Sequence, residues 1–240
     1  MITENYFDNI ISVLSQIKDT QKEKMQEAAK MIAETIKNDG IIYIFGCGHS
    51  HLIALDCFYR AGGLANVSAM LDTDLMLHNG AAKSSKMEKM QGIAESVFER
   101  YCITEKDVLI TVSTSGKNAV PVEMAQTATR NGIKNISVVS SSYFVDKKES
   151  PLLYECSDIF IDNCVPHGDA VIEIEGAQTK MGSVSTAASS FILQSVLMEA
   201  ASLAEKDGAD LPIYMSGNID GGDAYNNAVI AEHKDNIFYM

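Results

Sequence analysis

The chain has 240 residues, of which 46% are hydrophobic and 21% charged, and its formal net charge at pH 7 is -13. A chain of this length and apolar content can bury a substantial core as one α/β domain with additions. The acidic charge argues against nucleic-acid binding, because a protein that binds the phosphate backbone needs a basic surface. Any anionic ligand would therefore be held by local dipoles and a few cations.

The cysteines and the N-terminal residues indicate the compartment. No disulfide framework or zinc ribbon is predicted from the five cysteines, which are widely spaced and odd in number: Cys47, Cys57, Cys102, Cys156 and Cys164. Residues 1–6 lack the basic region and apolar run of a signal peptide. No segment approaches the ~20 apolar residues that span a bilayer. We expect a cytoplasmic protein with no membrane partner.

The hydrophobic pattern alternates between strand and helix signals. Residues 4–38 carry apolar side chains at helical spacings, with a possible break at Asp19 and Thr20. Five apolar runs predict the buried strands of a parallel sheet: residues 41–45, 64–70, 108–112, 136–139 and 158–162. Helical patterns follow the first three of these runs, at residues 50–60, 85–100 and 119–130, and a fourth closes the core at residues 185–206. This alternation predicts an α/β fold with helices on both faces of the sheet.

A polar loop follows the third predicted strand at residues 113–118. Ser113, Thr114 and Ser115 offer hydroxyl donors where the strand ends, and the glycine after them lets the backbone approach a ligand. Asn118 is placed to cap the next helix, whose free N–H groups and dipole favour an anion. The alternative is a polar strand–helix turn without function. Turns of that kind seldom need so many hydroxyl and amide groups, so the pattern favours a phosphate cradle.

A glycine-rich loop follows the first predicted strand. Gly46 and Gly48 permit a tight turn and a close backbone approach, and Ser50 can cap the following helix. A dinucleotide-binding fingerprint would need a third glycine where His51 stands, so we do not predict a nucleotide site.

The same loop raises the question of a metal ion. Cys47, His49 and His51 alternate along it, but three ligands so close on a turning loop rarely converge on one ion, and no carboxylate cluster accompanies them. We interpret the histidines as structural or substrate-contacting groups and expect no metal.

Three further segments carry possible functional groups. Residues 71–85 are too long and mixed for a simple connector, and His78 within them is either an acid–base group or a hydrogen-bonded loop histidine. Ser84 or Ser85 would cap the helix that runs to about residue 100. Residues 171–176 alternate apolar and acidic side chains as a half-exposed strand does, with Glu173 and Glu175 on its exposed face. Residues 207–240 are turn-rich, then helical, and could cap a site, including a neighbour's.

The two loops together resemble a known family. Residues 113–118 resemble the phosphate loop of the sugar isomerase (SIS) domain, usually Ser-x-Ser-Gly-x-Ser/Thr, with Asn118 in the last place. Residues 41–50 resemble the family's first strand and its Gly-x-Gly-x-Ser loop. The resemblance covers roughly residues 32–204, and residues 71–100 resemble a branch of phosphosugar isomerase-like proteins.

The resemblance implies a fold, a ligand and an assembly. It implies a flavodoxin-like three-layer sandwich with a five-stranded parallel sheet, in a single SIS-type domain over residues 1–240. That domain comprises a helical preface (1–38), a core (39–206) and a C-terminal cap (207–240). The implied ligand is a phosphorylated sugar, and no cofactor is implied. In proteins of this family the helical preface commonly packs on a partner subunit, so we expect a homodimer or larger homo-oligomer.

The residues expected to bind the sugar phosphate lie on the two loops. They are Gly46, Gly48, His49, Ser50, Ser113, Thr114, Ser115, Lys117 and Asn118. The expected reaction is aldose–ketose isomerisation, which needs a group that moves a proton between C1 and C2. The acid–base candidates are Glu175, Glu173 and His78, with His49 and His51 as further possibilities. Lys180 and Gly182 resemble the Lys-x-Gly that opens the last core helix in several SIS enzymes, and Glu173 or Glu175 would supply the carboxylate placed nearby.

One departure keeps other functions open. Phosphoheptose isomerases carry a Phe-Ala-Glu-Glu pattern in the first core helix, whereas residues 57–60 here, Cys-Phe-Tyr-Arg, carry no carboxylate. That subfamily's mechanism therefore does not transfer. Cleavage of an amino-sugar phosphate ether by a related lyase, and non-catalytic sensing of a sugar phosphate, remain alternatives. The absence of a basic helix-turn-helix segment counts against the sensor.

Overall fold

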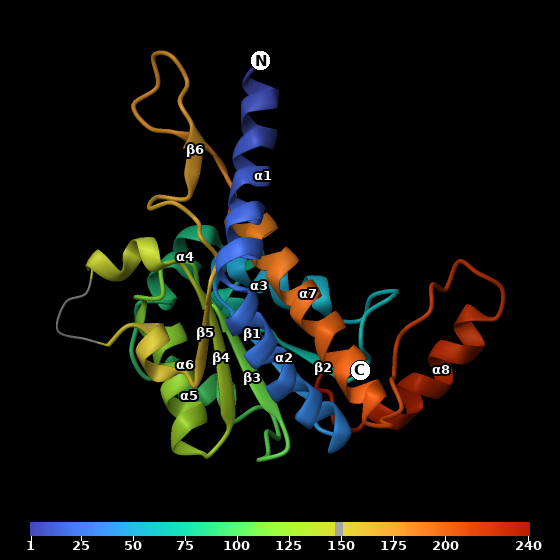
Figure 1. The fold of residues 1–240 in the computed structure, drawn as a ribbon. Helices are drawn as coiled ribbons and strands as arrows, with labels where there is room; N and C mark the ends of the chain where they lie inside the picture. The colour runs from blue at the N-terminus through green and yellow to red at the C-terminus, as the bar shows by residue number, and fades with distance from the viewer. Residues whose placement is uncertain (147–150) are drawn as a thin grey trace.

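A five-stranded parallel sheet forms the centre of the computed structural model, which describes residues 1–146 and 151–240. Its strand order is β2-β1-β3-β4-β5 (Figure 1). The bounds are β1 Ile42–Gly46, β2 Val67–Met70, β3 Val108–Val112, β4 Lys134–Val139 and β5 Ile159–Asp162. Because helices cover both faces, β1, β2 and β3 are buried throughout, as their continuous apolar runs predict. The predicted flavodoxin-like sheet is confirmed.

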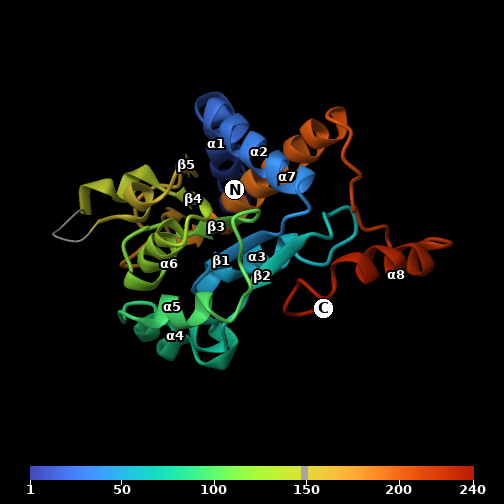
Figure 2. The same ribbon diagram turned by 90° about the horizontal axis from the view of Figure 1, so that it is seen from below.

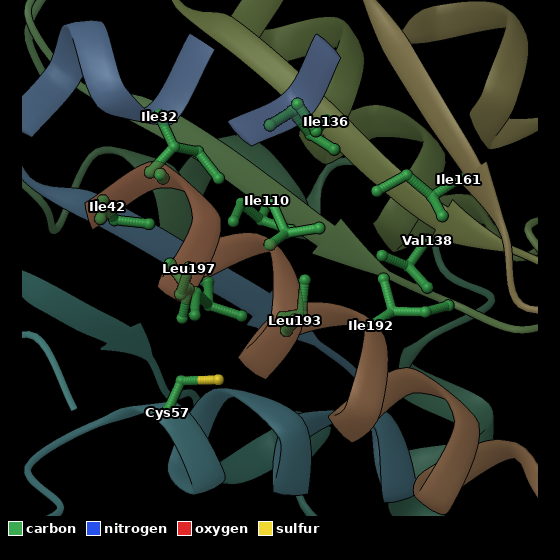
Figure 3. Packing of buried hydrophobic residues seen from close by; sticks show 14 of the residues in the cluster. Ile32, Ile42, Cys57, Ile110, Ile136, Val138, Ile161, Ile192, Leu193 and Leu197 are labelled. Carbon is green, nitrogen blue, oxygen red and sulfur yellow. The ribbon is translucent and has the colours of Figure 1, made fainter. Parts of the chain in front are cut away.

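Two helical layers enclose this sheet, as Figure 2 shows. One layer contains α1 (Ile2–Thr20), α2 (Lys22–Lys37), α3 (His51–Cys57) and α7 (Ser185–Lys206). The other contains α4 (Ala81–Met87), α5 (Ile93–Phe98) and α6 (Ala119–Arg130). In the first layer, Ile32 of α2 and Leu193 of α7 pack with Ile110 of β3 in the largest apolar cluster (Figure 3). The buried apolar residues therefore divide mainly between the two faces of one sheet.

The predicted helix over residues 85–100 is wrong in its start and its continuity. It is two short helices, α4 and α5, separated at Gly92, which has φ +83°. Ser84 lies inside α4, where its buried hydroxyl donates to the carbonyl oxygen of Leu75 at 2.9 Å. The serine that looked like a cap instead fastens α4 to the 3-10 turn η2 (Thr73–Leu75), which a second such turn, η3 (Leu77–Asn79), follows.

The half-exposed strand predicted over residues 171–176 is shorter than expected. Strand β6 (Ala170–Ile172) pairs antiparallel with β7 (Met181–Ser183), and the residues between them form an exposed turn. The Tyr6 hydroxyl of α1 donates to Ser183 O at 2.6 Å and holds the base of this hairpin. The hairpin and the start of α1 extend side by side away from the sheet (Figure 1).

The start of helix α7 is capped by a carboxylate from outside the helix. Asp169 accepts hydrogen bonds from the N–H groups of Val184 and Ser185, at 2.9 and 2.8 Å. Helix α7 has 22 residues and contains a window of mean hydropathy 1.3, so by length and composition alone this helix could cross a membrane. The expectation that no segment comes near that composition is therefore wrong. Half of that window is buried within the fold, as in the core helix of a globular protein.

The C-terminal residues lie beside β2. An isolated bridge joins Leu64 to Ile213, and α8 (Gly222–His233) follows. Phe238 then packs on Tyr101 with ring centroids 5.4 Å apart. Within the chain this segment lies at the β2 edge, far from β5 and from the β6–β7 hairpin (Figures 1 and 2).

Candidate functional site

The two loops that the sequence singles out lie side by side. Strands β1 and β3 are neighbours, with Gly46 paired to Val112, so residues 46–50 and 113–118 leave the sheet at the same edge. The chain passes from β1 outward to β2 and then returns to β3 on the other side of β1. Ligands of open α/β sheets bind at such a switch point, outside the carboxyl ends of the strands.

The loop at residues 113–118 presents hydroxyl groups on a fixed backbone. Ser113 and Ser115 are half-buried, and Ser113 Oγ accepts a hydrogen bond from Gly116 N at 3.3 Å. Gly116 has φ +59°, and a Cβ there would lie 3.2 Å from Val139 Cγ1. The Ser115 hydroxyl has no hydrogen-bond partner within residues 1–146 and 151–240. This hydroxyl is therefore available to a ligand.

The start of α6 differs from the expected anion site. Asn118 has the backbone of an N-cap residue, with φ -76° and ψ 150°, but its side chain makes no capping hydrogen bond. Its side chain lies near the carboxyl group of Glu88, where it lowers the pKa of that group against the opposing effect of burial. Val120 N donates to Glu88 O at 3.0 Å, and Pro121 has no N–H. Two of the first three helix positions thus cannot donate to an anion, so α6 contributes mainly its dipole.

The loop after β1 turns within very little space. A Cβ at Gly46 would lie 2.6 Å from the carbonyl carbon and oxygen of Ser50, and Gly48 has φ +58°. Ser50 stands before α3, but its side chain makes no capping hydrogen bond, so the predicted cap is wrong. Its N–H donates to Cys47 O at 2.9 Å, which closes the turn.

Three histidines gather beside this loop. The ring of buried His51 lies edge-on to His78 with centroids 5.9 Å apart, and its Nδ1 hydrogen-bonds to Gly48 O. Burial lowers the pKa of His51, and charges on His78 and His49 lower it further, against the opposing effect of the Gly48 carbonyl. A histidine that is neutral at physiological pH can accept a proton. The structure therefore brings His78, His49 and His51 to the sheet edge that carries both loops.

Comparison with known proteins identifies the family. The SIS domain model matches residues 5–140. A UPF0309 protein of Brucella anthropi is 41% identical over 236 residues, which cover 98% of this chain and 97% of that protein. A UPF0309 protein of Geobacillus thermodenitrificans is 38% identical over 238 residues, covering 98% and 96%. The chain belongs to the SIS domain family.

Solved structures share the SIS fold. A phosphoheptose isomerase from Francisella tularensis superposes with a TM-score of 0.57 at 15% identity, covering 82% of this chain and 95% of that one. The phosphoheptose isomerase of Neisseria gonorrhoeae superposes with a TM-score of 0.54 at 18% identity, covering 83% of this chain and 97% of that one. The sugar isomerase domain of the RpiR transcription factor from Sphaerobacter thermophilus superposes with a TM-score of 0.51 at 16% identity, covering 97% of this chain and 98% of that one. At these identities the similarity shows the fold alone.

The two glutamates predicted as acid–base groups lie apart from the SIS loops in this protomer. Glu173 and Glu175 are exposed on the turn of the β6–β7 hairpin, where Lys180 Nζ lies 3.5 Å from a Glu173 oxygen. The hairpin projects away from the sheet (Figure 1). Of the residues predicted as acid–base groups, the histidines His78, His49 and His51 share the sheet edge with the loops, whereas Glu173 and Glu175 do not.

The structure adds groups that the sequence did not point to. Buried Asn163, directly after β5, donates to Thr114 Oγ1 and to Ser189 Oγ of α7, both at 3.3 Å. Tyr143 stacks on His167 with centroids 4.4 Å apart, and Lys117 Nζ lies 5.4 Å from the Tyr143 ring centroid. Both segments follow strand ends, which is the signal that would have found them.

Metal binding has no support from side-chain geometry. Within the described residues, no three His, Cys, Asp or Glu side chains are grouped to hold an ion. Cys47 is buried, and burial raises the pKa of its thiol well above the usual value. A thiol that stays protonated is a poor ligand and a poor nucleophile.

Proposed function

We propose that this SIS protein binds a phosphorylated sugar between residues 46–50 and 113–118. The observation that carries the proposal is the half-buried hydroxyl loop at the switch point, with the Ser115 hydroxyl unpartnered among the described residues. In the proposed complex the phosphate contacts Ser113, Thr114, Ser115, Lys117 and Asn118. The sugar hydroxyls contact Ser50, His49 and the backbone at Gly46 and Gly48.

The proposed reaction is aldose–ketose isomerisation. It requires a group that moves a proton between C1 and C2 and a second group that polarises the carbonyl. The cluster of His51, His78 and His49 supports this chemistry, because burial lowers the pKa of His51 and so favours its neutral form. Glu175 and Glu173 remain candidates through a neighbouring protomer.

Two alternatives stay open beside isomerisation. A non-catalytic sugar-phosphate sensor is one, since the same fold occurs in the sugar isomerase domain of a transcription factor. An amino-sugar phosphate lyase or etherase is the other, because residues 57–60 carry no carboxylate and the phosphoheptose isomerase mechanism does not transfer. Asp56 stands beside that stretch, but it accepts hydrogen bonds from Ser190 Oγ at 2.6 Å and Gln194 Nε2 at 3.1 Å and so joins α3 to α7.

One NMR screen separates these functions. The protein is incubated with aldose, ketose and amino-sugar phosphates, and 31P and 13C spectra are followed over time. An isomerase converts one sugar phosphate into its isomer, and a lyase or etherase releases a second organic product. Binding without turnover of any sugar phosphate would support the sensor, and neither binding nor turnover would contradict the proposal.

We also propose that two copies associate through α1 and α7. Exposed apolar side chains gather there, with Phe7 67%, Phe191 59% and Met198 63% exposed. A groove between the helices is rimmed by charges of both signs, which include Lys18, Lys22, Asp19 and Glu199. A two-fold axis places the same patch of both copies face to face, and a rim with charges of both signs allows opposite charges to pair across it. We propose that a second copy of the chain covers this groove.

Light scattering tests the dimer. We expect the parent protein to give twice the chain mass of 26.1 kDa and Phe191→Asp to give 26.1 kDa, because a buried unpaired carboxylate disfavours the contact. Met90→Asp is the matched control, since Met90 is 51% exposed in the segment between α4 and α5. A parent mass of 26.1 kDa at all working concentrations would contradict the proposal.

The cysteines support a cytoplasmic protein. All five are free, and Cys47 and Cys57 are buried. Free thiols are usual in the reducing cytoplasm, where disulfides are rare. We therefore propose that the protein acts there.

A further inference from the structure

Glu88 is anchored to the start of α6 by its backbone. It stands at the end of α4, where its carbonyl oxygen accepts from Val120 N at 3.0 Å. Its half-buried carboxyl group lies near the Asn118 side chain, which makes no helix-capping hydrogen bond. Glu88 is therefore fixed against the last residue of the hydroxyl loop.

The carboxyl group of Glu88 also lies within electrostatic range of the first loop. Its charge and that of Asp72 act on the buried Cys47 thiol, which separates Gly46 from Gly48. Lys89 lies beside it on its own segment. Burial raises the pKa of Glu88, while the charge of Lys89 and the nearby Asn118 side chain oppose that shift. Glu88 is thus a partly buried carboxyl group near both loops, which is the environment in which acid–base groups are commonly found.

We propose that Glu88 is the ionisable carboxyl group of the sugar-phosphate site and the acid–base group of its reaction. This inference rests on the proposed function. The Glu88 carboxylate would accept the proton from C2 of the open-chain aldose phosphate, and the electrons of that C–H bond would form the C1–C2 double bond of an enediol. Return of the proton to C1 gives the ketose, while a second group moves a proton from O2 to O1. No oxidant or reductant is consumed.

The proposal makes a prediction for anion binding that does not require turnover. Sulfate is the probe, because its charge stays constant between about pH 5 and pH 8, a range that lies above the ordinary glutamate pKa of about 4.3. As pH rises through the pKa of Glu88, its negative charge should oppose the bound anion. We therefore expect Glu88→Gln to bind sulfate about five-fold more tightly than the parent near pH 8, with the difference vanishing at low pH.

A matched control isolates Glu88 from other titrating groups. Glu95→Gln removes one carboxylate from α5, where Glu95 pairs with Arg130 at 3.7 Å, and should bind sulfate as the parent does. His49, His51, His78, Asp72 and Lys89 are present in all three proteins, so their titration cancels in the comparison. Calorimetry at each pH gives the affinities.

The second measurement is turnover of the sugar phosphate found by NMR. Glu88→Gln should lose roughly 10²–10⁴-fold in kcat while its KM near pH 8 falls by no more than the about five-fold gain in anion affinity, and Glu95→Gln should lose none. A parental sulfate profile in Glu88→Gln would overturn the placement of Glu88 in the site. An altered profile with parental kcat would overturn its acid–base role alone. If the parent and Glu95→Gln bind neither sulfate nor sugar phosphate, the proposed function itself fails, and this inference falls with it.

Discussion

Replacing Ser113 and Ser115 together with alanine is expected to weaken sugar-phosphate binding by roughly 10²–10⁴-fold, because each hydrogen bond to a charged group contributes roughly 1.5–3 kcal/mol. The two side chains lie on one half-buried loop at the sheet edge, and the Ser115 hydroxyl has no partner within the described residues. Removing the two hydroxyls deletes ligand contacts and leaves the buried strand β3 unchanged. Calorimetry with the sugar phosphates that bind the parent measures the loss.

The control changes two serines outside the loops. Ser15 and Ser202 are exposed on α1 and α7, so the double variant Ser15→Ala and Ser202→Ala should keep the parental affinity. Circular dichroism of both double variants should match the parent. If the Ser113 and Ser115 variant binds as tightly as the control, the phosphate is held elsewhere.

Gly46→Ala is expected to lower the free energy of unfolding by about 3 kcal/mol and to abolish sugar-phosphate binding. The new Cβ would lie 2.6 Å from the carbonyl carbon and oxygen of Ser50, which are backbone atoms and cannot rotate away. Overpacking of this kind costs roughly 1–3 kcal/mol and occasionally more. For a chain of this size, each kcal/mol lowers Tm by about 2–4 °C.

Gly132→Ala separates steric crowding from the general cost of adding a methyl group. Gly132 has φ +71°, and a Cβ added there would meet no atom within 4 Å, so only its left-handed backbone is disfavoured, by about 1–2 kcal/mol. It stands after α6, at the opposite end of that helix from residues 113–118. Chemical denaturation and calorimetry should show the larger stability loss and the binding loss in Gly46→Ala alone. Equal stabilities with unchanged binding would show that the turn at Gly46 can relax.

The sheet and its order of elements could be predicted because their signals are local. Continuous apolar runs such as residues 108–112 are fully buried in parallel strands, and the polar residues that follow them reach the same edge. The break of the first helix near Thr20 and the span of α7 were also visible in the pattern. These features need only the periodicity of a single segment.

Other features depend on contacts between distant residues. Ser84 had the appearance of an N-cap, but its hydroxyl reaches Leu75 O, and the left-handed Gly92 stands directly before α5, after α4 has ended at Met87. Asp169 caps α7 from outside the helix. No local signal in the sequence indicates such tertiary hydrogen bonds.

The acid–base groups were the least predictable part of the candidate site. Glu175 belongs to an alternating pattern that favours a strand, yet the strand ends at Ile172 and the glutamate lies on an exposed turn. Glu88 lies among charged and polar residues that suggest an ordinary helix surface. Its neighbour Asn118 is 30 positions away along the chain, and only the packing of α5 against α6 and the Val120 N–Glu88 O hydrogen bond bring the two together.

The most direct test of the central claim is a crystal structure of the protein bound to a sugar phosphate that the NMR screen identifies. The phosphate is predicted within hydrogen-bonding distance of the hydroxyl groups of Ser113 and Ser115, with the sugar over residues 46–50 and facing His51. A phosphate bound along the α1–α7 groove or on the β6–β7 hairpin, with residues 113–118 uncontacted, would contradict the account.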